Sequence, residues 1–568
     1  MVLSGYKKRV AWLPVIIALA AVLPYIFGLD GDFVFDDVPL IKNDPFYKTE
    51  SNPLRCWTRS FWKESQTQGL YRPVTLFSYW LDVRVFSVFS GKDSGGLYPP
   101  GFRLVNLLLH AAISVMLFLL AVRLSLGRLA AFAAALIYAV HPIHVEAVTP
   151  AFGRGELLCV FFLLAGLLLH LRRPRWIGTG AWKYAGLPAT AFCFLLSFMS
   201  KEHGAAFLPI CVLIDAYRYR GRWQEKLRSP LVWRRYILYV LTVGAVFAVR
   251  RFALGSWLPK QQFFDPFIDN IIALSPPHLR VVSAIRLQGL ALVKFLYPAV
   301  LSSDYSYAQF LPSKSVFDAY AWLTLGLFAA VPALFIKLAP RRGWATLLLT
   351  ALFIVSILPG GNFIVPGGTV FAERLQYLPS IWLSMFAGLV VSRVWRAVSA
   401  SDGTGNRRRL AALAFIAVIV AFSARTVLRT LDWRDDATIS TVRARTAPNS
   451  VKALNNYAVV LGDSGHLEEG VVVCSRAIAI HPKYATAYAN RGLFLAKMGR
   501  VSAAVRDFET ALRLSRYHPV ASYNLGVILA NRGKIEEARA LWLNAAKAHP
   551  DYPPLKRALE KSGGDRPK

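Results

Sequence analysis

Apolar residues in this chain form long blocks up to residue 427, and a polar, periodic segment follows from residue 451. A membrane-spanning helix needs about 20 mostly apolar residues. By this criterion we predict about eleven spans, at 10–29, 102–122, 129–149, 154–171, 182–199, 203–216, 236–253, 318–337, 343–358, 376–396 and 410–427. The segment 279–301 is also apolar but carries Arg286, Gln288 and Lys294. We therefore expect 279–301 to be an interfacial or re-entrant helix, and 203–216 is short enough to be re-entrant as well.

Small residues recur every 34 positions in the polar segment. They are Gly465, Gly499 and Gly533, and Ala477, Ala511 and Ala545. This period is typical of tetratricopeptide repeats (TPR), in which small residues let paired helices pack closely. We predict an all-α protein, with a membrane domain over 1–430 and a TPR domain over 451–568. The predicted repeats are 451–484, 485–518 and 519–552, and the usual role of such repeats is to bind a protein or peptide.

The formal net charge is +33, and much of the Lys and Arg lies in short loops between apolar blocks. Basic loops of this kind stay in the cytoplasm, so the charge indicates membrane topology. We expect no nucleic-acid partner, because the soluble part has no basic stripe interleaved with aromatic residues. With Lys7, Lys8 and Arg9 in the cytoplasm, an odd number of spans sends the TPR domain to the opposite side of the membrane.

Ionisable residues at span ends are costly, which makes them candidates for function. The first such group is Asp36 and Asp37, two adjacent carboxylates in the loop after the first span. A carboxylate at this place can act as a general base. Arg72 lies just before another apolar run, where an arginine can hold a phosphate. A solvated acidic loop and an interfacial anchor are the non-functional alternatives for these two groups.

A second set of polar residues lies at later span ends, which the predicted topology puts on the same side. It comprises His141, His144, Glu146, Arg154, Lys201, Glu202, His203, Asp304, Tyr305, Glu373 and Arg374. His141, His144 and Glu146 have spacing that suggests zinc, but Pro142 disturbs the helical geometry and no third histidine is near. We therefore predict no metal ligands, although a divalent cation is not ruled out, and we expect one polar cavity on one face of the bundle.

Six strings occur in order before the repeats: FVFDDVPLIKND, YRPVTLFSYWLD, HPIHVEAVTPAFGRGELL, SKEHGAAFLPICVLID, YPAVLSSDYSY and AERLQYLPSIW. Together with the repeats, they resemble the transmembrane-and-TPR-containing (TMTC) O-mannosyltransferases over about residues 10–552. The animal members carry many more repeats, so the chain looks like a bacterial relative, with its active site and TPR domain on the periplasmic side of the inner membrane.

The resemblance implies a glycosyltransferase of the GT-C fold, with no cofactor. Such enzymes take a sugar from a polyprenyl phosphate and pass it to a Ser or Thr hydroxyl of a protein. Mannose is the sugar that the resemblance leads us to expect. The resemblance implies Asp36, with Asp37 second, as the catalytic base. It implies that the donor phosphate and sugar are bound by Arg72, Arg154, Lys201, Glu202, Glu373 and Arg374, of which Lys201 and Arg374 are favoured. Further cavity residues are His141, His144, Glu146, His203, Arg286, Asp304 and Tyr305.

Two other functions fit the same architecture. One is a membrane scaffold without catalysis, whose TPR domain organises an assembly of the cell envelope. The other is an oligosaccharide ligase or polymerase, which also joins spans to repeats. A ligase needs a long outer loop between late spans, and the loop 359–375 is short.

Overall fold

The fold was obtained as a computed structural model that describes residues 12–62, 69–91, 95–172, 182–257, 265–401 and 405–562. Within these ranges every regular element is a helix, as predicted. The chain divides into two compact units. Unit 1 comprises residues up to 264, 272–303 and 312–436, and unit 2 comprises 265–271, 304–311 and 437–568. The N-terminal basic residues Lys7, Lys8 and Arg9 lie outside the described ranges.

Unit 1 is an integral membrane domain. Six of its described helices are long and apolar enough to cross a membrane: Pro99–Arg123 (α5), Ala151–His170 (which includes α8, Arg154–His170), Pro230–Leu254 (α12), Ala319–Leu338 (α14), Pro379–Ala400 (within α16, Pro379–Ser401) and Asn406–Leu431 (α17). A seventh span results if Arg128–Val140 (α6) and Pro142–Val148 are counted as one helix bent by 50°. The other predicted blocks form the shorter helices α2 (Leu13–Val22), α9 (Trp182–Ser200), α10 (Phe207–Arg218) and α15 (Gly343–Ile357). The expected count of about eleven spans therefore stays a prediction.

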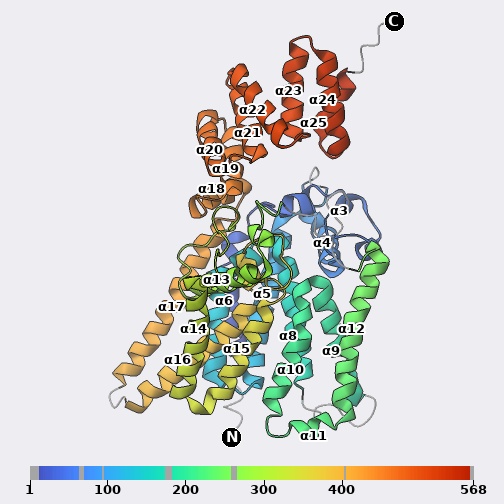
Figure 1. Cartoon of the computed structure of the whole chain (residues 1–568). Coiled ribbons are helices and arrows are strands. Elements are labelled where there is room, and N and C mark those ends of the chain that lie inside the picture. The colour runs from blue at the N-terminus through green and yellow to red at the C-terminus, as the bar shows by residue number, and fades with distance from the viewer. Residues whose placement is uncertain are drawn as a thin grey trace. The chain divides into compact units, whose positions relative to one another are not determined.

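Close packing between the spans depends on small residues, as is usual in membranes. Helix α6 packs against α16, where a Cβ on Gly388 would lie 2.2 Å from the carbonyl oxygen of Ala130. Figure 1 shows α8, α9, α10 and α12 side by side in unit 1, and α8 also packs against α5. The apolar blocks thus form one helical bundle.

Breaks in the helices occur where the sequence has proline and where polar residues gather. Helix α6 ends at His141 because Pro142 disfavours helical dihedral angles in the residue before it, and His141 has φ −73° and ψ 124°. Short helices follow at Pro142–His144, Val145–Val148 (α7) and Ala151–Gly153 before α8 begins. Helix α13 (Pro277–Leu296) covers most of the segment predicted to be interfacial, and it is not among the described helices that meet the criteria for a span.

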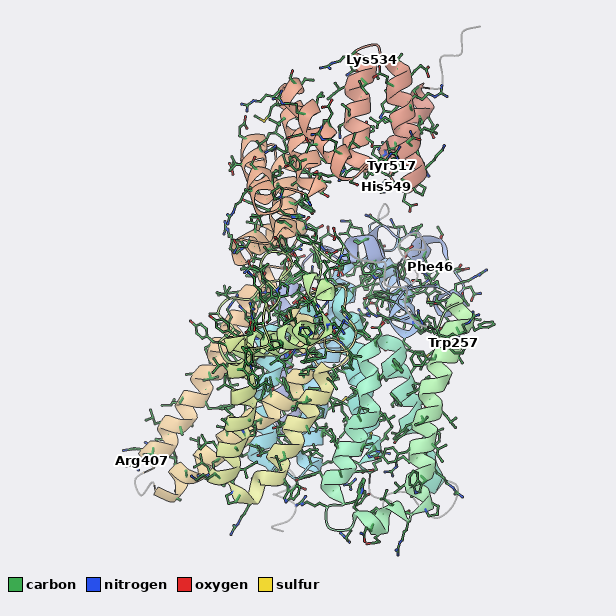
Figure 2. The ribbon with its side chains drawn as sticks, viewed as in Figure 1. Phe46, Trp257, Arg407, Tyr517, Lys534 and His549 are labelled. Atoms are coloured by element: carbon green, nitrogen blue, oxygen red, sulfur yellow. The ribbon has the colours of Figure 1, made fainter. Side chains whose placement is uncertain are left out.

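The two ends of the unit 1 bundle differ in their side chains. Arg407, at the start of α17, lies at one end, whereas Phe46 and Trp257 lie at the other (Figure 2). The chain around α11 (Trp223–Leu227), which is rich in basic residues, lies at the same end as Arg407 (Figure 1). Basic loops therefore gather at one end of the bundle.

Unit 2 contains the repeats as three helix pairs: α19 (Val451–Asp463) with α20 (Leu467–Ile480), α21 (Ala485–Lys497) with α22 (Val501–Leu514), and α23 (Pro519–Asn531) with α24 (Ile535–Ala548). Helices α18 (Asp436–Thr446) and α25 (Pro553–Ser562) flank them. Gly465, Gly499 and Gly533 have φ of 83°, 77° and 81°, a left-handed conformation that lets each first helix turn into its partner. Gly526 packs against Trp542, where a Cβ would lie 2.2 Å from the indole nitrogen.

Two segments from the membrane half of the sequence, 265–271 and 304–311, belong to unit 2. Asp304 is buried there and accepts hydrogen bonds from Arg443 (2.9 Å), from the Ser306 hydroxyl (2.6 Å) and from the Ser450 hydroxyl (3.1 Å). Arg443 is itself only 2% exposed and forms an ion pair with this carboxylate at 2.9 Å.

We expect Asp304→Asn to destabilise unit 2 by about 3–5 kcal/mol, because the change leaves a buried guanidinium without its counter-charge. Thermal unfolding of the purified protein in detergent measures the effect. Asp463→Asn is the matched control, because Asp463 is exposed at the end of α19. Equal unfolding temperatures for both variants would contradict this role of Asp304.

Candidate active site

Asp37 fastens the first loop of unit 1 to the start of α8. Its side chain is 1% exposed and accepts backbone N–H groups from Phe152 (2.6 Å), Ala151 (3.1 Å) and Val34 (3.3 Å). Burial raises the pKa of Asp37 to about 7, while the positive charge of Arg103 and the three N–H donors act to lower it. These three N–H groups come from the first loop and from the turn before α8, so Asp37 positions the loop.

Asp36, the adjacent carboxylate, is in a different environment. Its side chain is 29% exposed, and its Oδ2 lies 3.8 Å from Nη2 of Arg374. The structure gives it no side-chain hydrogen bond in the described part of the chain. Phe35 before it has φ 54°, a conformation that is uncommon for a bulky residue and is often found at functional sites. Neighbouring residues thus separate into a buried anchor and an accessible carboxylate.

Arg374 is held beside Asp36 by Glu146. The Glu146 carboxylate is fully buried, accepts the backbone N–H of Arg374 at 3.0 Å and forms an ion pair with its guanidinium. The guanidinium carbon also lies 5.0 Å from the centre of the Phe152 ring. Burial acts to lower the pKa of Arg374, but Glu146 and Asp36 outweigh it and raise this pKa. Arg374 therefore stays charged in a defined position.

Lys201 and His203 share one buried carboxylate, Glu156, in the first turn of α8. The Lys201 ammonium contacts Oε1 of Glu156, and Nδ1 of His203 lies 3.0 Å from Oε2. Glu156 is 1% exposed and Lys201 is 8% exposed. Burial lowers the pKa of Lys201, and the charge of Glu156 opposes this change.

Arg72 is held by Glu202 in a bidentate pair. Its Nη2 lies 2.7 Å from Oε2 of Glu202, and its Nε lies 3.1 Å from Oε1. This fork geometry fixes the guanidinium plane. Arg72 also lies over the ring of Phe61, 4.8 Å from its centre.

These groups interact electrostatically as one polar cluster. Lys201 is influenced by both Arg72 and Arg374, and Arg374 is influenced by Asp36 and Glu156. Three cations therefore each have a close carboxylate partner, while Asp36 is 29% exposed and lies farther from its nearest cation, at 3.8 Å. An ammonium has three donors and a guanidinium has five, so each cation retains N–H groups that can bind a phosphate oxygen.

Two residues predicted to bind the donor are used inside the protein. Arg154 is fully buried, donates to Asp82 (2.8 Å) and to the carbonyl of Phe102 (2.7 Å), and contacts Asn106. Glu373 is also fully buried, and it accepts the backbone N–H of Ser302 at 2.6 Å. Its other oxygen lies 3.7 Å from Arg429. Arg154 and Glu373 thus have surroundings that suit positioning residues.

Two of the predicted histidines, His141 and His144, have both ring nitrogens engaged. His141 contacts the carbonyl of Phe295 (2.8 Å) and accepts the N–H of Ile143 (3.1 Å). His144 contacts the carbonyl of Tyr138 (2.9 Å) and the hydroxyl of Ser380 (2.8 Å). No group of three or more His, Cys, Asp or Glu side chains in the described residues is arranged to hold a metal ion.

The remaining predicted residues lie in other surroundings. Arg286 forms an ion pair with Asp318 at 3.3 Å, at the start of α14. Tyr305 is buried in unit 2, next to Asp304.

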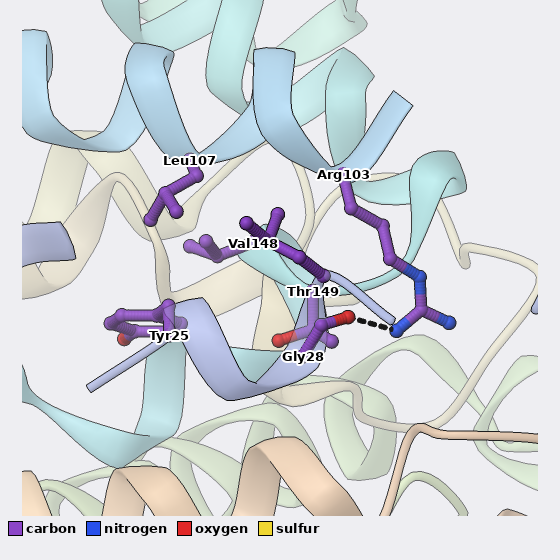
Figure 3. Close-up of a pocket in the computed structure, with 7 residues that line it drawn as sticks. Tyr25, Gly28, Arg103, Leu107, Val148 and Thr149 are labelled. Atoms are coloured by element: carbon purple, nitrogen blue, oxygen red, sulfur yellow. Dashed lines mark hydrogen bonds between the residues drawn. The ribbon is translucent and has the colours of Figure 1, made fainter. Parts of the chain in front are cut away.

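Sequence reasoning missed Arg103, which lies within α5. It is 3% exposed and donates to the carbonyls of Gly28 (2.7 Å) and Trp433 (2.9 Å), as well as to that of Asp32. Figure 3 shows its bond to Gly28 beside a small cavity lined by Tyr25, Leu107, Val148 and Thr149. The cavity has a volume of about 10 Å³, enough for one water and far too small for a sugar. An arginine inside an apolar block was the signal that could have identified this anchor.

Comparison with known proteins identifies similar sequences over most of the chain. A tetratricopeptide-repeat family model matches residues 490–553. Protein O-mannosyl-transferase F38B6.6 of Caenorhabditis elegans is 27% identical over 490 residues, covering 85% of this chain and 64% of the relative. Protein O-mannosyl-transferase TMTC3 is 26% identical in Mus musculus and 25% in Homo sapiens, with 92% of this chain and 58% of each relative covered. The chain thus resembles the TMTC proteins, as predicted, and spans about six-tenths of their length.

Among solved structures, the oligosaccharyltransferase of Archaeoglobus fulgidus tethered to an acceptor peptide is 14% identical, with a TM-score of 0.44 and coverage of 82% of this chain and 59% of that protein. The same archaeal enzyme in complex with an inhibitory peptide and a dolichol-phosphate is 15% identical, with a TM-score of 0.40 and the same coverage.

We expect Asp37→Asn to lower the unfolding temperature, whereas Asp36→Asn leaves it within error of the wild type. An amide at Asp37 replaces one accepting oxygen with a donor and leaves buried N–H groups unpaired, at a cost of about 1–3 kcal/mol for each. Thermal unfolding in detergent compares the two variants. Equal losses would mean that both aspartates are anchors.

Proposed function

We propose that this protein is a GT-C-type membrane glycosyltransferase that moves a sugar, mannose in the first instance, from a polyprenyl phosphate to a Ser or Thr hydroxyl of a protein. The observation that carries the proposal is the accessible carboxylate of Asp36, 3.8 Å from Arg374 and in one cluster with two further cations. The names of the similar proteins support the same reaction class. The reaction takes place on the non-cytoplasmic side, and a bacterial inner membrane is the expected setting.

Asp36 is the general base in this proposal. It accepts the proton of the acceptor hydroxyl as the hydroxyl oxygen attacks the anomeric carbon of the sugar. Attack from the face opposite the phosphate inverts the configuration at that carbon. Arg374 is the cation beside this carboxylate, with Nη2 3.8 Å from Oδ2 of Asp36.

Lys201, Arg374 and Arg72 stabilise the phosphate that departs. The bond between the anomeric carbon and the phosphate oxygen breaks with both electrons on the phosphate, so negative charge grows there. Cations that are already in position stabilise this charge without reorganising during the reaction. The partner carboxylates Glu146, Glu156 and Glu202 hold the cations in place, which explains why each cation has one.

The TPR domain is proposed to bind the acceptor protein. Its first and second repeats together line a groove of about 250 Å³, with Val471 and Ser475 from the first repeat and Arg491, Leu495 and Asp507 from the second. Arg491 spans this groove, with two hydrogen bonds of 2.8 Å to Asp507 and one of 3.0 Å to Ser475. Repeats of this kind present such surfaces to peptides.

We expect Asp36→Asn to reduce transfer of labelled mannose from polyprenyl-phosphate mannose to a Ser/Thr peptide by about 10²–10⁴-fold, because the base is lost. Asp463→Asn on the exposed end of α19 is the control and keeps wild-type activity. Full activity in the Asp36 variant would refute the mechanism. No transfer by the wild type from any of several polyprenyl-phosphate sugars would favour a non-catalytic scaffold.

We expect Lys201→Met to lower kcat by about 10²–10³-fold with a smaller change in KM for the donor, because the ammonium acts mainly on charge that develops in the transition state. Initial rates over a range of donor concentrations separate the two constants. A change confined to KM would instead give Lys201 a role in donor binding alone.

A further inference from the structure

Glu156 and His203 form a buried carboxylate–histidine pair that the mechanism above leaves without a chemical role. Oε2 of Glu156 lies 3.0 Å from Nδ1 of His203, while Oε1 is used by Lys201. The two residues are 1% and 6% exposed. Whereas Glu146 and Glu202 each hold one arginine, Glu156 holds a lysine and a histidine together.

The pair determines which nitrogen of His203 carries a proton. An ionised carboxylate can only accept hydrogen bonds, so Nδ1 must be the donor. The second nitrogen, Nε2, is then the atom that exchanges a proton, as in other carboxylate–histidine pairs. The structure gives Nε2 no hydrogen-bond partner in the described part of the chain.

The position of Nε2 is restricted by Gly360, at the start of the loop that leads to Arg374. A Cβ on Gly360 would lie 2.3 Å from Nε2 and 3.1 Å from Cε1 of His203. A side chain at position 360 would therefore displace the imidazole. The ring is held on one edge by Glu156 and limited on the other by Gly360.

Among the described residues, Glu156 on α8 is the charged group in contact with this ring. Lys201 shares Glu156, Glu202 interacts with Lys201, and Arg374 interacts with Glu156. Helix α15 and the segment 358–371 carry no charged residue.

We propose that His203 is a second proton-transfer residue, which donates the proton on Nε2 to the phosphate oxygen of the departing lipid. This inference rests on the proposed function. The bond between the anomeric carbon and oxygen breaks with its electron pair on the phosphate, and that oxygen takes the proton from Nε2. The acceptor proton is on Asp36, and His203 is left neutral with Nδ1–H still bonded to Glu156. Exchange with solvent restores both groups.

The chemistry of the two groups is complementary. Histidine is the side chain most often used as a general acid, and a phosphate oxygen that gains an electron pair can accept a proton. The transfer also prevents the departing phosphate from gaining a second negative charge next to the carboxylates of Glu146, Glu156 and Glu202.

The test is the pH dependence of kcat for transfer from polyprenyl-phosphate mannose. In the wild type, kcat falls as the pH rises, because the proposed step needs a proton on Nε2. His203→Gln lowers kcat by about 10²–10⁴-fold at neutral pH and removes this fall. A wild-type fall that persists in His203→Gln would overturn the proposal, since a merely structural residue leaves the shape of the profile unchanged.

Gly360→Ala provides a variant that keeps both partners but displaces the ring. We expect it to lower kcat and to weaken the high-pH fall, whereas Gly326→Ala changes neither, because nothing lies within 4 Å of a Cβ at Gly326. Thermal unfolding verifies that each variant is folded. A wild-type profile in folded Gly360→Ala protein would count against the proposal.

Nitrogen-15 NMR of histidine-labelled protein reads the tautomer of His203 without any sugar transfer, with His203→Gln used to assign the signal. An Nδ1–H tautomer that is lost in Glu156→Gln supports the pair. Active wild-type protein with the opposite tautomer would overturn the pair and leave the proposed function intact. Wild-type protein that transfers no sugar would overturn the function, and the proton donation with it, whatever the tautomer.

Discussion

A positive charge placed at the edge of a membrane bundle needs a negative partner, and the polar part of unit 1 is organised around this constraint. Removing an ion from water costs several kcal/mol, which only a close counter-ion and further hydrogen bonds offset. Arg374 has Glu146, Lys201 has Glu156, Arg72 has Glu202 and the deeply buried Arg154 has Asp82. Each pair joins elements that are distant in sequence, so the same contacts that satisfy the charges also assemble the cluster.

The helix breaks follow from the same need. Short helices and turns between Pro142 and α8 bring Glu146 and Phe152 against the same guanidinium, that of Arg374. Non-helical backbone at this depth is tolerated where it is enclosed by protein, because its N–H and C=O groups find partners there. Asp37 supplies such a partner, since it accepts the N–H groups of Ala151 and Phe152. The carboxylate that anchors the first loop therefore also satisfies the break before α8.

The adjacent aspartates show how backbone geometry separates two residues of one type. Asp37 accepts hydrogen bonds from three backbone N–H groups, whereas Asp36 has one ion contact, with Arg374 at 3.8 Å. Phe35, the residue before Asp36, has a positive φ. This conformation is strained, and the surrounding contacts must compensate for its cost. Proteins give identical side chains different roles by placing them in different environments.

The sequence by itself determined what depends on local pattern: the apolar blocks, the helical class, the 34-residue repeat and the set of polar residues at span ends. Period and block length are local quantities, which is why they could be read from the printed chain. The tertiary structure decided which cationic side chain pairs with which carboxylate. Glu146 and Arg374 are 228 residues apart, and Glu156 and Lys201 are 45 apart, so no spacing rule pairs them. The structure also decided that Arg154 and Glu373 have partners inside the protein and that Asp304 belongs to the repeat unit, because burial and counter-ions depend on elements brought together only by folding.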